Sequence, residues 1–435
     1  MIVVKFRDIT IVENYFNNRK KLQTKPFSIL IRNAYFCAWN FASLNFNQKI
    51  NYHMKQLGIE IGDHYLDDTA ARDMVLSLSY TIQNSLRKSI VSTGSFVSLM
   101  IDESIDNSHE SKLLLLLRYC DGTQPKEKYL SILKLQPGTA ESIFNKAWNA
   151  LLHEDFMDKL ILVLGDNAPV IQGKIGGVIA LFKEKINHLK EGRCIAHLNN
   201  LIVKNMVESI KKVSLLKNFV YKMVDYIQKS SFKKELFKQI QEEQEQYSKS
   251  LICPFDIRWS SFYFSLSRII EVYPSLVNTF NHLSEEGLDA TATGYLIKLT
   301  DLETLSLILI LEELLQPFSK SDEGFQLAEL TVGEALEKAN QLKDNLCLLF
   351  RTETDYGYWL GCLKSEFETS QTFHGVPITN KKNLEFSALR ILAVEYRDQL
   401  HKLLIEKFEH LEKYTIFNVL DFCSLIKEKE IGRTV

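Results

Sequence analysis

The chain contains few of the residues that interrupt regular secondary structure. Its 435 residues include only 18 glycines and 8 prolines, which is about 4% and 2% against usual shares of ~7% and ~5%. Because few breakers allow few loops, we expect a mostly helical protein. The length predicts two or three domains and a large buried core.

No charge of one sign dominates. With 52 basic and 54 acidic side chains, the net charge is −2. This balance excludes a globally cationic nucleic-acid coat and an acidic disordered tail, but it leaves local patches open. The longest nearly apolar run, Leu305 to Leu311, is far shorter than the ~20 residues that span a bilayer. Met1 to Arg7 also meets charge too early for a secretory signal peptide.

The seven cysteines are odd in number, widely scattered and without a CxxC pair. This pattern indicates reduced thiols in the cytosol or nucleus and not a disulfide framework. It also excludes a zinc finger built on CxxC pairs within these residues.

Short apolar runs in the first half of the chain predict a sheet. We expect strands at 96–103, 112–120, 127–135 and 160–165, a fifth around 193–196, and helices after the third and the fourth. The second and third strands should form a hairpin around Asp121 to Pro125, and Thr139 should cap a helix that runs to about His153. The fourth strand is hydrophobic throughout, so we expect it to be buried on both faces.

From about residue 197 onward the periodicity is helical. The fold class is therefore α+β and mostly α, with a mixed β-sheet domain. We predict a helical region at 1–90, a five-stranded core at 91–200, an all-α domain at 201–385 and a helical C-terminal region at 386–435. Interruptions are expected at Pro254, Pro274, Pro317 and 373–383.

Two aspartates follow strands that can be neighbours. Asp102 ends the first strand and Asp166 ends the fourth, and these strands can lie side by side after three antiparallel strands and a helical crossover. Two carboxylates would then share a site suited to divalent cations in phosphoryl transfer. Either aspartate alone could equally be a helix cap or a turn residue.

Four motifs around these aspartates are similar to those of a known family. They are Ile101 to Asp106, Gly165 to Gly173, Arg193 to Leu201 and Asp256 to Ser261. In this order they resemble the motifs of hAT-superfamily transposases and their domesticated descendants. The flanks at 9–16 and 396–408 match more loosely.

The resemblance implies an RNase H-like core, interrupted after its fifth strand by a large all-α insertion at 201–385. Active members cut and rejoin DNA with an Asp-Asp-Glu triad and magnesium, and Asp102 and Asp166 match the two aspartates. It further implies that Cys194 and His197 line a DNA-end pocket and that Arg258 and Trp259 lie near the active site.

Each of these residues also has a simpler interpretation. Cys194 and His197 supply only half of a tetrahedral zinc site, and they could be a buried thiol and a helix-start histidine. Arg258 and Trp259 could hold a phosphate and stack on an extruded base, or the tryptophan could belong to the core.

A lysine-rich stretch is the candidate for contact with the DNA backbone. Residues 204–234 contain eight lysines against two acids. On one continuous helix, five of them fall on one side, opposite an apolar side: Lys204, Lys211, Lys222, Lys229 and Lys233. This stripe could track phosphates or could simply be a solvated helix face.

The chain departs from the family pattern at the third acid. No Ser-Glu-Arg motif follows Trp259, and the most similar segment, Ser-Glu-Phe at 365–367, lacks the arginine. Glu103 and Asp106 are possible substitutes, but Glu103 follows Asp102 directly in a strand and should point to the opposite face. We expect a chain truncated before the family's Ser-Glu-Arg and dimerisation region.

These observations predict a catalytically inactive, transposase-derived nuclear protein that acts through DNA or protein binding. It should require no cofactor, with weak magnesium binding at Asp102 and Asp166 if activity remains. One alternative is a residual magnesium-dependent nuclease or strand transferase. Another is a protein-interaction scaffold without DNA contact. The expected partners are DNA, and a protein or second copy that covers an exposed sheet face, but no membrane.

Overall fold

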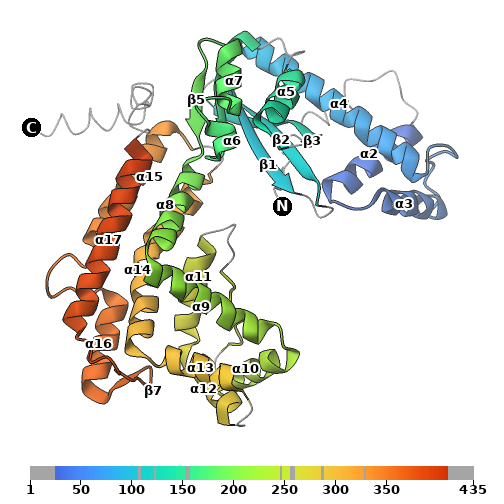
Figure 1. The fold of residues 1–435 in the computed structure, drawn as a ribbon. Helices are drawn as coiled ribbons and strands as arrows, with labels where there is room; N and C mark the ends of the chain where they lie inside the picture. Colours follow the sequence, from blue (N-terminus) through green and yellow to red (C-terminus); the bar gives the residue numbers. More distant parts are fainter. Residues whose placement is uncertain are drawn as a thin grey trace, which may run out of the picture. The chain divides into compact units, whose positions relative to one another are not determined.

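The computed structural model describes residues 25–105, 109–121, 124–136, 138–151, 157–244, 247–254, 260–285, 289–327 and 330–409. The chain divides into two compact units, Met1–Arg193 and Cys194–Val435. Figure 1 shows the elements of each unit. The flanking motif at 9–16 lies outside the described residues.

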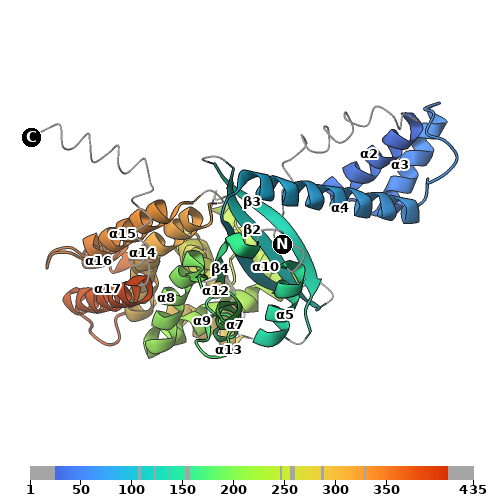
Figure 2. The ribbon, with the colours of Figure 1, turned by 90° about the horizontal axis from the view of Figure 1, so that it is seen from above.

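The first unit begins with three helices, α2 (Lys25–Trp39), α3 (Leu44–Gln56) and α4 (Asp68–Thr93). Asp67 caps α4 by accepting a hydrogen bond from the Ala70 amide at 2.7 Å, and Gly94 ends it with φ of 68°. The N-terminal part of α4 packs on α2 and α3, while Leu86 and Ile90 near its other end pack on the sheet. Figure 2 shows this bridging position of α4. The helical prediction is confirmed for the described residues.

A five-stranded mixed sheet follows. Its strands are β1 (Val97–Ile105), β2 (Ser111–Asp121), β3 (Gln124–Lys134), β4 (Leu160–Gly165) and β5 (Lys190–Arg193). The order is β3-β2-β1-β4-β5, with antiparallel pairing among the first three strands and parallel pairing of β1 with β4 and of β4 with β5. The predicted hairpin and the predicted adjacency of the first and fourth strands are confirmed.

The connections of the sheet are short helices. They are α5 (Ala140–Leu151), the 3₁₀ turn η1 (Met157–Lys159), α6 (Pro169–Gln172) and α7 (Val178–Lys185). Thr139 caps α5 as predicted, since its hydroxyl accepts a hydrogen bond from the Ser142 amide at 3.3 Å.

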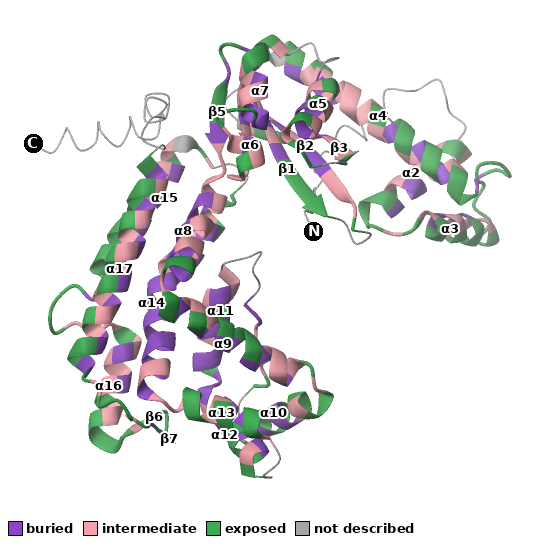
Figure 3. Cartoon of the chain, in the orientation of Figure 1, coloured by how far each residue is buried: buried purple, intermediate pink, exposed green. Residues whose placement is uncertain are grey.

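The two faces of the sheet are buried to different extents. One face packs against Phe144 of α5 and Phe182 of α7, whose rings are 5.0 Å apart. Its strand residues are 0–4% exposed: Leu99, Ile101, Leu113, Leu115, Leu117 and Val163. On the other face, Leu162 and Leu164 of β4 are only half-buried, and Figure 3 shows the burial classes along the chain. The prediction that the fourth strand is buried on both faces is therefore wrong, because α5 and α7 both cover the same side.

The fifth strand lies three residues earlier than predicted. Ile195 and Ala196 open a helix, α8 (Ile195–Ser209), while β5 consists of Lys-Glu-Gly-Arg. The apolar residues belong to the helix because its buried side recurs at helical spacing, at Leu198, Ile202 and Met206. Backbone pairing with β4 holds the polar edge strand in place.

The described part of the second unit is helical apart from one small hairpin. Its helices are α8, α9 (Lys211–Gln228), α10 (Ser231–Glu243), α11 (Ser260–Glu271), α12 (Tyr273–Glu285), α13 (Ala290–Leu299), α14 (Leu302–Phe325), α15 (Val332–Leu348), α16 (Tyr358–Ser370) and α17 (Phe386–Phe408). The hairpin of β6 (Thr372–Phe373) and β7 (Val376–Pro377) lies in the predicted interruption at 373–383. No described helix is long and apolar enough to cross a membrane.

Proline positions match the prediction with one exception. Pro254 lies between helices and Pro274 lies in the first turn of α12, where a missing amide is tolerated. Pro317, however, lies inside α14, so the predicted interruption there is wrong. A proline in a helix interior costs about 3 kcal/mol, and the nearly complete burial of α14 from Leu305 to Leu315 offsets this cost.

Candidate functional site

The two predicted aspartates lie on adjacent parallel strands, but only one of them is at a strand end. Asp166 directly follows β4, which ends at Gly165, whereas β1 continues to Ile105, so the prediction that Asp102 ends its strand is wrong. The register of β1 and β4 pairs Leu99 with Val163 and Met100 with Leu164. Two residues further along, this register brings Asp102 level with Asp166. Residues that are level on adjacent parallel strands lie at the same edge of the sheet, so both aspartates belong to one edge.

Asp166 is positioned by the turn that follows β4. Its Oδ1 accepts a hydrogen bond from the Ala168 amide at 3.0 Å. The Gln172 Nε2 donates to the backbone oxygens of Asp166 and Gly192, both at 3.0 Å, and so ties α6 to the ends of β4 and β5. Gly165 is needed before the aspartate, because a Cβ there would lie 2.7 Å from the Ile171 side chain.

This pair has part of the chemistry of a magnesium site. Magnesium in phosphoryl-transfer sites is held by one or two carboxylates together with waters and substrate phosphates. Asp102 and Asp166 fit that donor set, although one oxygen of Asp166 is engaged in the turn. Among the described residues, no group of three or more His, Cys, Asp and Glu side chains is arranged to hold a metal ion.

Of the two residues that could replace the family's third acid, Glu103 and Asp106, the structure describes only Glu103. Glu103 pairs across the sheet with Leu113, whose side chain is on the core face, so Glu103 is on the face opposite to Asp102, as strand alternation predicts. A Cβ on Gly138 would lie 3.4 Å from the Glu103 Oε1. Asp106 lies outside the described residues.

Cys194 and His197 occur at the start of α8, in the second unit. Cys194 is the N-cap residue, His197 is in the first turn, and both are half-buried. Arg258 and Trp259 lie outside the described residues, directly before α11, which begins at Ser260.

A buried aspartate that the sequence analysis did not identify connects these two motif regions. Asp322 of α14 is 5% exposed, and its Oδ1 accepts a hydrogen bond from the Asn199 Nδ2 at 2.6 Å. Burial raises the pKa of Asp322 to about 6, and hydrogen bonds from Asn199 and Ser260 oppose this rise. The sequence could have indicated this buried acid, because Asp322 is spaced from Leu315 and Phe318 so that all three fall on the apolar side of one helix.

The predicted five-lysine stripe is wrong as one continuous surface. Lys204 is in α8, Lys211 and Lys222 are in α9, Lys229 is the C-cap of α9, and Lys233 is in α10. The helix breaks between α8 and α9, where extended backbone at Ile210 (φ −101°, ψ 104°) separates them. Angles counted along a single helix therefore do not apply across 204–233.

The lysines also differ in their partners. The Lys233 Nζ lies 3.4 Å from the Asp289 Oδ2 and 3.2 Å from the centre of the Tyr226 ring. Lys204 pairs with Glu208 at 3.8 Å. Lys229 pairs with Asp225 at 2.9 Å, and this carboxylate raises the lysine pKa.

Three lysines of the predicted stripe form one exposed line along α9. Lys211, Lys222 and Lys229 are exposed and recur at helical intervals over about 27 Å. The opposite side of the helix is buried through Val213, Val220, Val224 and Ile227, as predicted. Three of the five predicted lysines therefore share one helix face.

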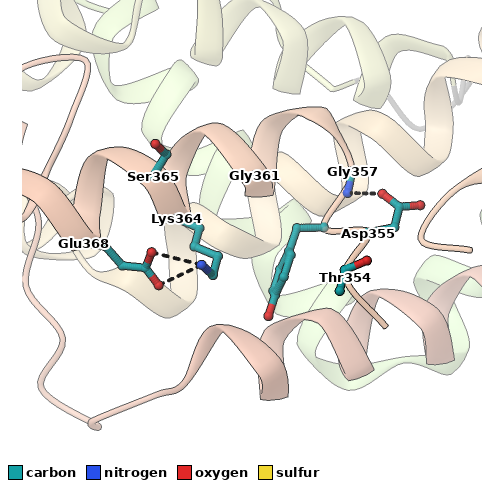
Figure 4. Close-up of a pocket in the computed structure, with 8 residues that line it drawn as sticks. Thr354, Asp355, Gly357, Gly361, Lys364, Ser365 and Glu368 are labelled. Atoms are coloured by element: carbon teal, nitrogen blue, oxygen red, sulfur yellow. Dashed lines mark hydrogen bonds and ion pairs between the residues drawn. The ribbon is translucent and has the colours of Figure 1, made fainter. Parts of the chain in front are cut away.

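A shallow cavity of about 390 Å³ lies beside the N-terminus of α16. Figure 4 shows Lys364 facing Glu368, and Asp355 accepting a hydrogen bond from the Gly357 amide. The Lys364 Nζ lies 2.8 Å from the Glu368 Oε1. None of the predicted site residues lines this cavity. Its lysine is already paired with Glu368, so Asp355 leaves the lining with a net charge of −1.

Comparison with known families adds one finding. A family model for the ZBED1 RNase-like helical domain matches residues 192–293. The matched region begins at the end of β5 and includes the motifs around Asn199 and Ser260. Together with the mixed five-stranded sheet, this match supports a transposase-derived protein of the hAT/ZBED type.

Proposed function

We propose that this chain is a transposase-derived nuclear protein that binds DNA without cutting it. The main support is the register of β1 and β4, which aligns Asp102 and Asp166 at one edge of the sheet. Such an edge is suited to a nucleic-acid backbone, since paired carboxylates hold the cations that neutralise phosphates. The ZBED1-type match that begins at the end of β5 supports the same origin.

The proposed loss of cleavage follows from the acids around this edge. Glu103 is on the far face of the sheet. Among the described residues, no third His, Cys, Asp or Glu side chain joins the two aspartates in a group that could hold a metal ion. With two carboxylates, magnesium would be held weakly and mainly through water and phosphate oxygens. Because the proposed DNA binding involves no cleavage, it requires no cofactor.

The exposed line on α9 supports contact with DNA. Lys211 and Lys222 have exposed side chains, whereas Lys204, Lys229 and Lys233 each have an acidic partner. Lysine contacts to phosphates dominate nonspecific DNA affinity and release bound counterions. DNA affinity should therefore fall steeply as salt rises.

The decisive experiment is a salt titration of binding to a fluorescent duplex of random sequence. A linear fall of log affinity with log salt supports DNA binding. The absence of binding at 50 mM salt would contradict it and would favour the interaction scaffold. In that case a protein partner or second copy would cover the half-buried sheet face that carries Leu162 and Leu164.

The aligned aspartates also favour a second function, a residual magnesium-dependent nuclease or strand transferase. This activity would require an acid that replaces the third member of the family triad. Nicking of plasmid DNA that depends on metal and is lost in both Asp102→Asn and Asp166→Asn would establish it.

A further inference from the structure

A short glycine loop after α6 holds one nearly fully exposed isoleucine. The loop runs Gly173-Lys174-Ile175-Gly176-Gly177. Ile175 is 97% exposed, more than any other large hydrophobic side chain in the described part of the chain. Its neighbours Lys174 and Gly176 are exposed as well, so the isoleucine stands alone at the tip.

Backbone packing positions this loop. A Cβ on Gly177 would lie 2.5 Å from the Gly173 oxygen, and one on Gly173 would lie 2.7 Å from the Pro169 oxygen. Gly176 has φ of +75°, a conformation that favours glycine. The Gly177 amide donates to the Gly173 oxygen at 3.2 Å. Larger residues would not fit, so the sequence specifies a tight turn that presents Lys174 and Ile175 outward.

The loop is anchored close to the aspartate edge. It follows Gln172 directly, and the Gln172 side chain is hydrogen-bonded to the Asp166 backbone oxygen at 3.0 Å. The surrounding segment is basic, since residues 169–193 carry five lysines and arginines against two glutamates. One of these lysines, Lys183, is paired with Glu191 at 2.5 Å, while Lys174 is exposed beside the isoleucine.

We propose that Ile175 is a DNA wedge, which inserts between base pairs of DNA held at the Asp102–Asp166 edge while Lys174 contacts the adjacent phosphate. This inference rests on the proposed function, because it needs bound DNA. DNA-bending proteins use single isoleucine, leucine or phenylalanine side chains in this way, and they unstack a base step to bend the duplex.

The single apolar tip fits DNA better than a protein surface. A stable protein interface buries about 800 Å² on each partner around an apolar centre. The loop offers one isoleucine between a lysine and glycines. A wedge needs only one apolar side chain on a well-positioned backbone, with a positive charge beside it. Both are present here.

A wedge also predicts a sequence preference. Unstacking costs a few kcal/mol per step, and pyrimidine–purine steps such as TA are the most easily unstacked. The wild-type chain should therefore prefer duplexes with a TA step, without any hydrogen bond to a base edge.

The test uses the full chain and short duplexes that carry 2-aminopurine at a TA step, where unstacking raises fluorescence. We expect a several-fold rise with the wild-type chain and loss of most of this rise with Ile175→Ser. For Ile175→Ser, the DNA affinity at low salt and the slope of log affinity against log salt should stay within about twofold of the wild-type values. Lys174→Gln should keep the rise and reduce the salt slope by about 0.9. Ile391→Ser, at a position in α17 that is 55% exposed, is the matched control and should behave as wild type.

The outcomes separate the wedge from DNA binding itself. If the wild-type chain binds DNA but raises no fluorescence at any labelled step, the wedge is wrong and the proposed function stands. An equal rise with Ile175→Ser also overturns the wedge. Failure of the wild-type chain to bind any duplex overturns both. If Ile175→Ser changes self-association and leaves the DNA signal intact, the side chain serves a protein contact instead.

Discussion

Asn199 of α8 and Asp322 of α14 are 123 positions apart in the chain, yet the Asn199 Nδ2 donates a 2.6 Å hydrogen bond to the Asp322 Oδ1. The same amide donates to the Phe318 oxygen at 2.9 Å. Asp322 also interacts with Ser260 at the start of α11. One buried carboxylate thus joins the segment after His197 to the segment after Trp259, both within the second unit.

The raised pKa of Asp322 makes this junction sensitive to pH. An unperturbed aspartate has a pKa of 3.8, whereas burial in the folded chain raises the pKa of Asp322 to about 6. Between about pH 4 and pH 6, the folded chain therefore holds a proton on Asp322 that the unfolded chain releases. The free energy of unfolding therefore falls as pH rises through this window, by roughly 3 kcal/mol at most. Asp322→Asn should remove this component of the pH dependence. Urea unfolding of both proteins between pH 4 and pH 8 measures it.

The control for this prediction is Asp344→Asn, at an exposed position on α15, which should leave the pH dependence as in wild type. If Asp322→Asn and wild type show parallel stability curves over this range, the buried carboxylate does not titrate as described.

Replacing Lys211, Lys222 and Lys229 with glutamine should weaken binding to all DNA sequences alike. The salt slope should flatten by about 0.9 for each phosphate that is no longer neutralised by a lysine. Lys229 should contribute least, because Asp225 already neutralises it. Fluorescence anisotropy at several salt concentrations gives both quantities. A triple variant with the same charge loss elsewhere, at Lys320, Lys343 and Lys402, should keep the wild-type slope, and equal effects of the two triples would reject the α9 surface.

The chain should not cleave DNA with magnesium or manganese, because in the described part of the chain no third metal-binding side chain joins the aspartate pair. Plasmid nicking measures this over hours at neutral pH. Asp102→Asn and Asp166→Asn should fold normally, since Asp102 is exposed and an asparagine at 166 can still accept the hydrogen bond from the Ala168 amide. These variants therefore show whether any observed cleavage belongs to this site.

Gly357→Ala should destabilise the second unit by about 2–4 kcal/mol. Gly357 has φ of 68° and ψ of −177°, a region open almost only to glycine. A Cβ there would lie 2.6 Å from the Glu313 Oε1, and the Glu313 carboxylate accepts hydrogen bonds from the Tyr358 and Trp359 amides at the start of α16. Chemical denaturation measures the change.

Gly361→Ala, one turn into the same helix, serves as the matched control. The nearest atom to its added Cβ is the Tyr356 Cβ at 3.9 Å, and alanine is the better helix former by about 1 kcal/mol. We expect this variant to be neutral or more stable. Destabilisation of equal size in both variants would show that the Gly357 backbone is not the cause.

Much of the sheet could be predicted because its signals are local. Apolar runs and the turn at Asp121 to Pro125 marked the strands and the hairpin, and strand alternation placed Glu103 opposite Asp102. The fifth strand was displaced because its own residues are polar and because the apolar residues after it serve α8. The break at Ile210 had no comparable marker, since neither glycine nor proline is present there.

Local sequence patterns were sufficient to predict most of the helices, the first four strands and their order along the chain, because periodicity and breaker residues act over a few neighbouring positions. Three properties became known from the packing of distant segments: which lysines remain exposed, which face of the sheet is covered, and that Asp322 is buried against Asn199. Such properties depend on contacts between residues that can be more than a hundred positions apart. Burial changes the solvation and the pKa of a side chain without leaving any pattern beside it in the chain.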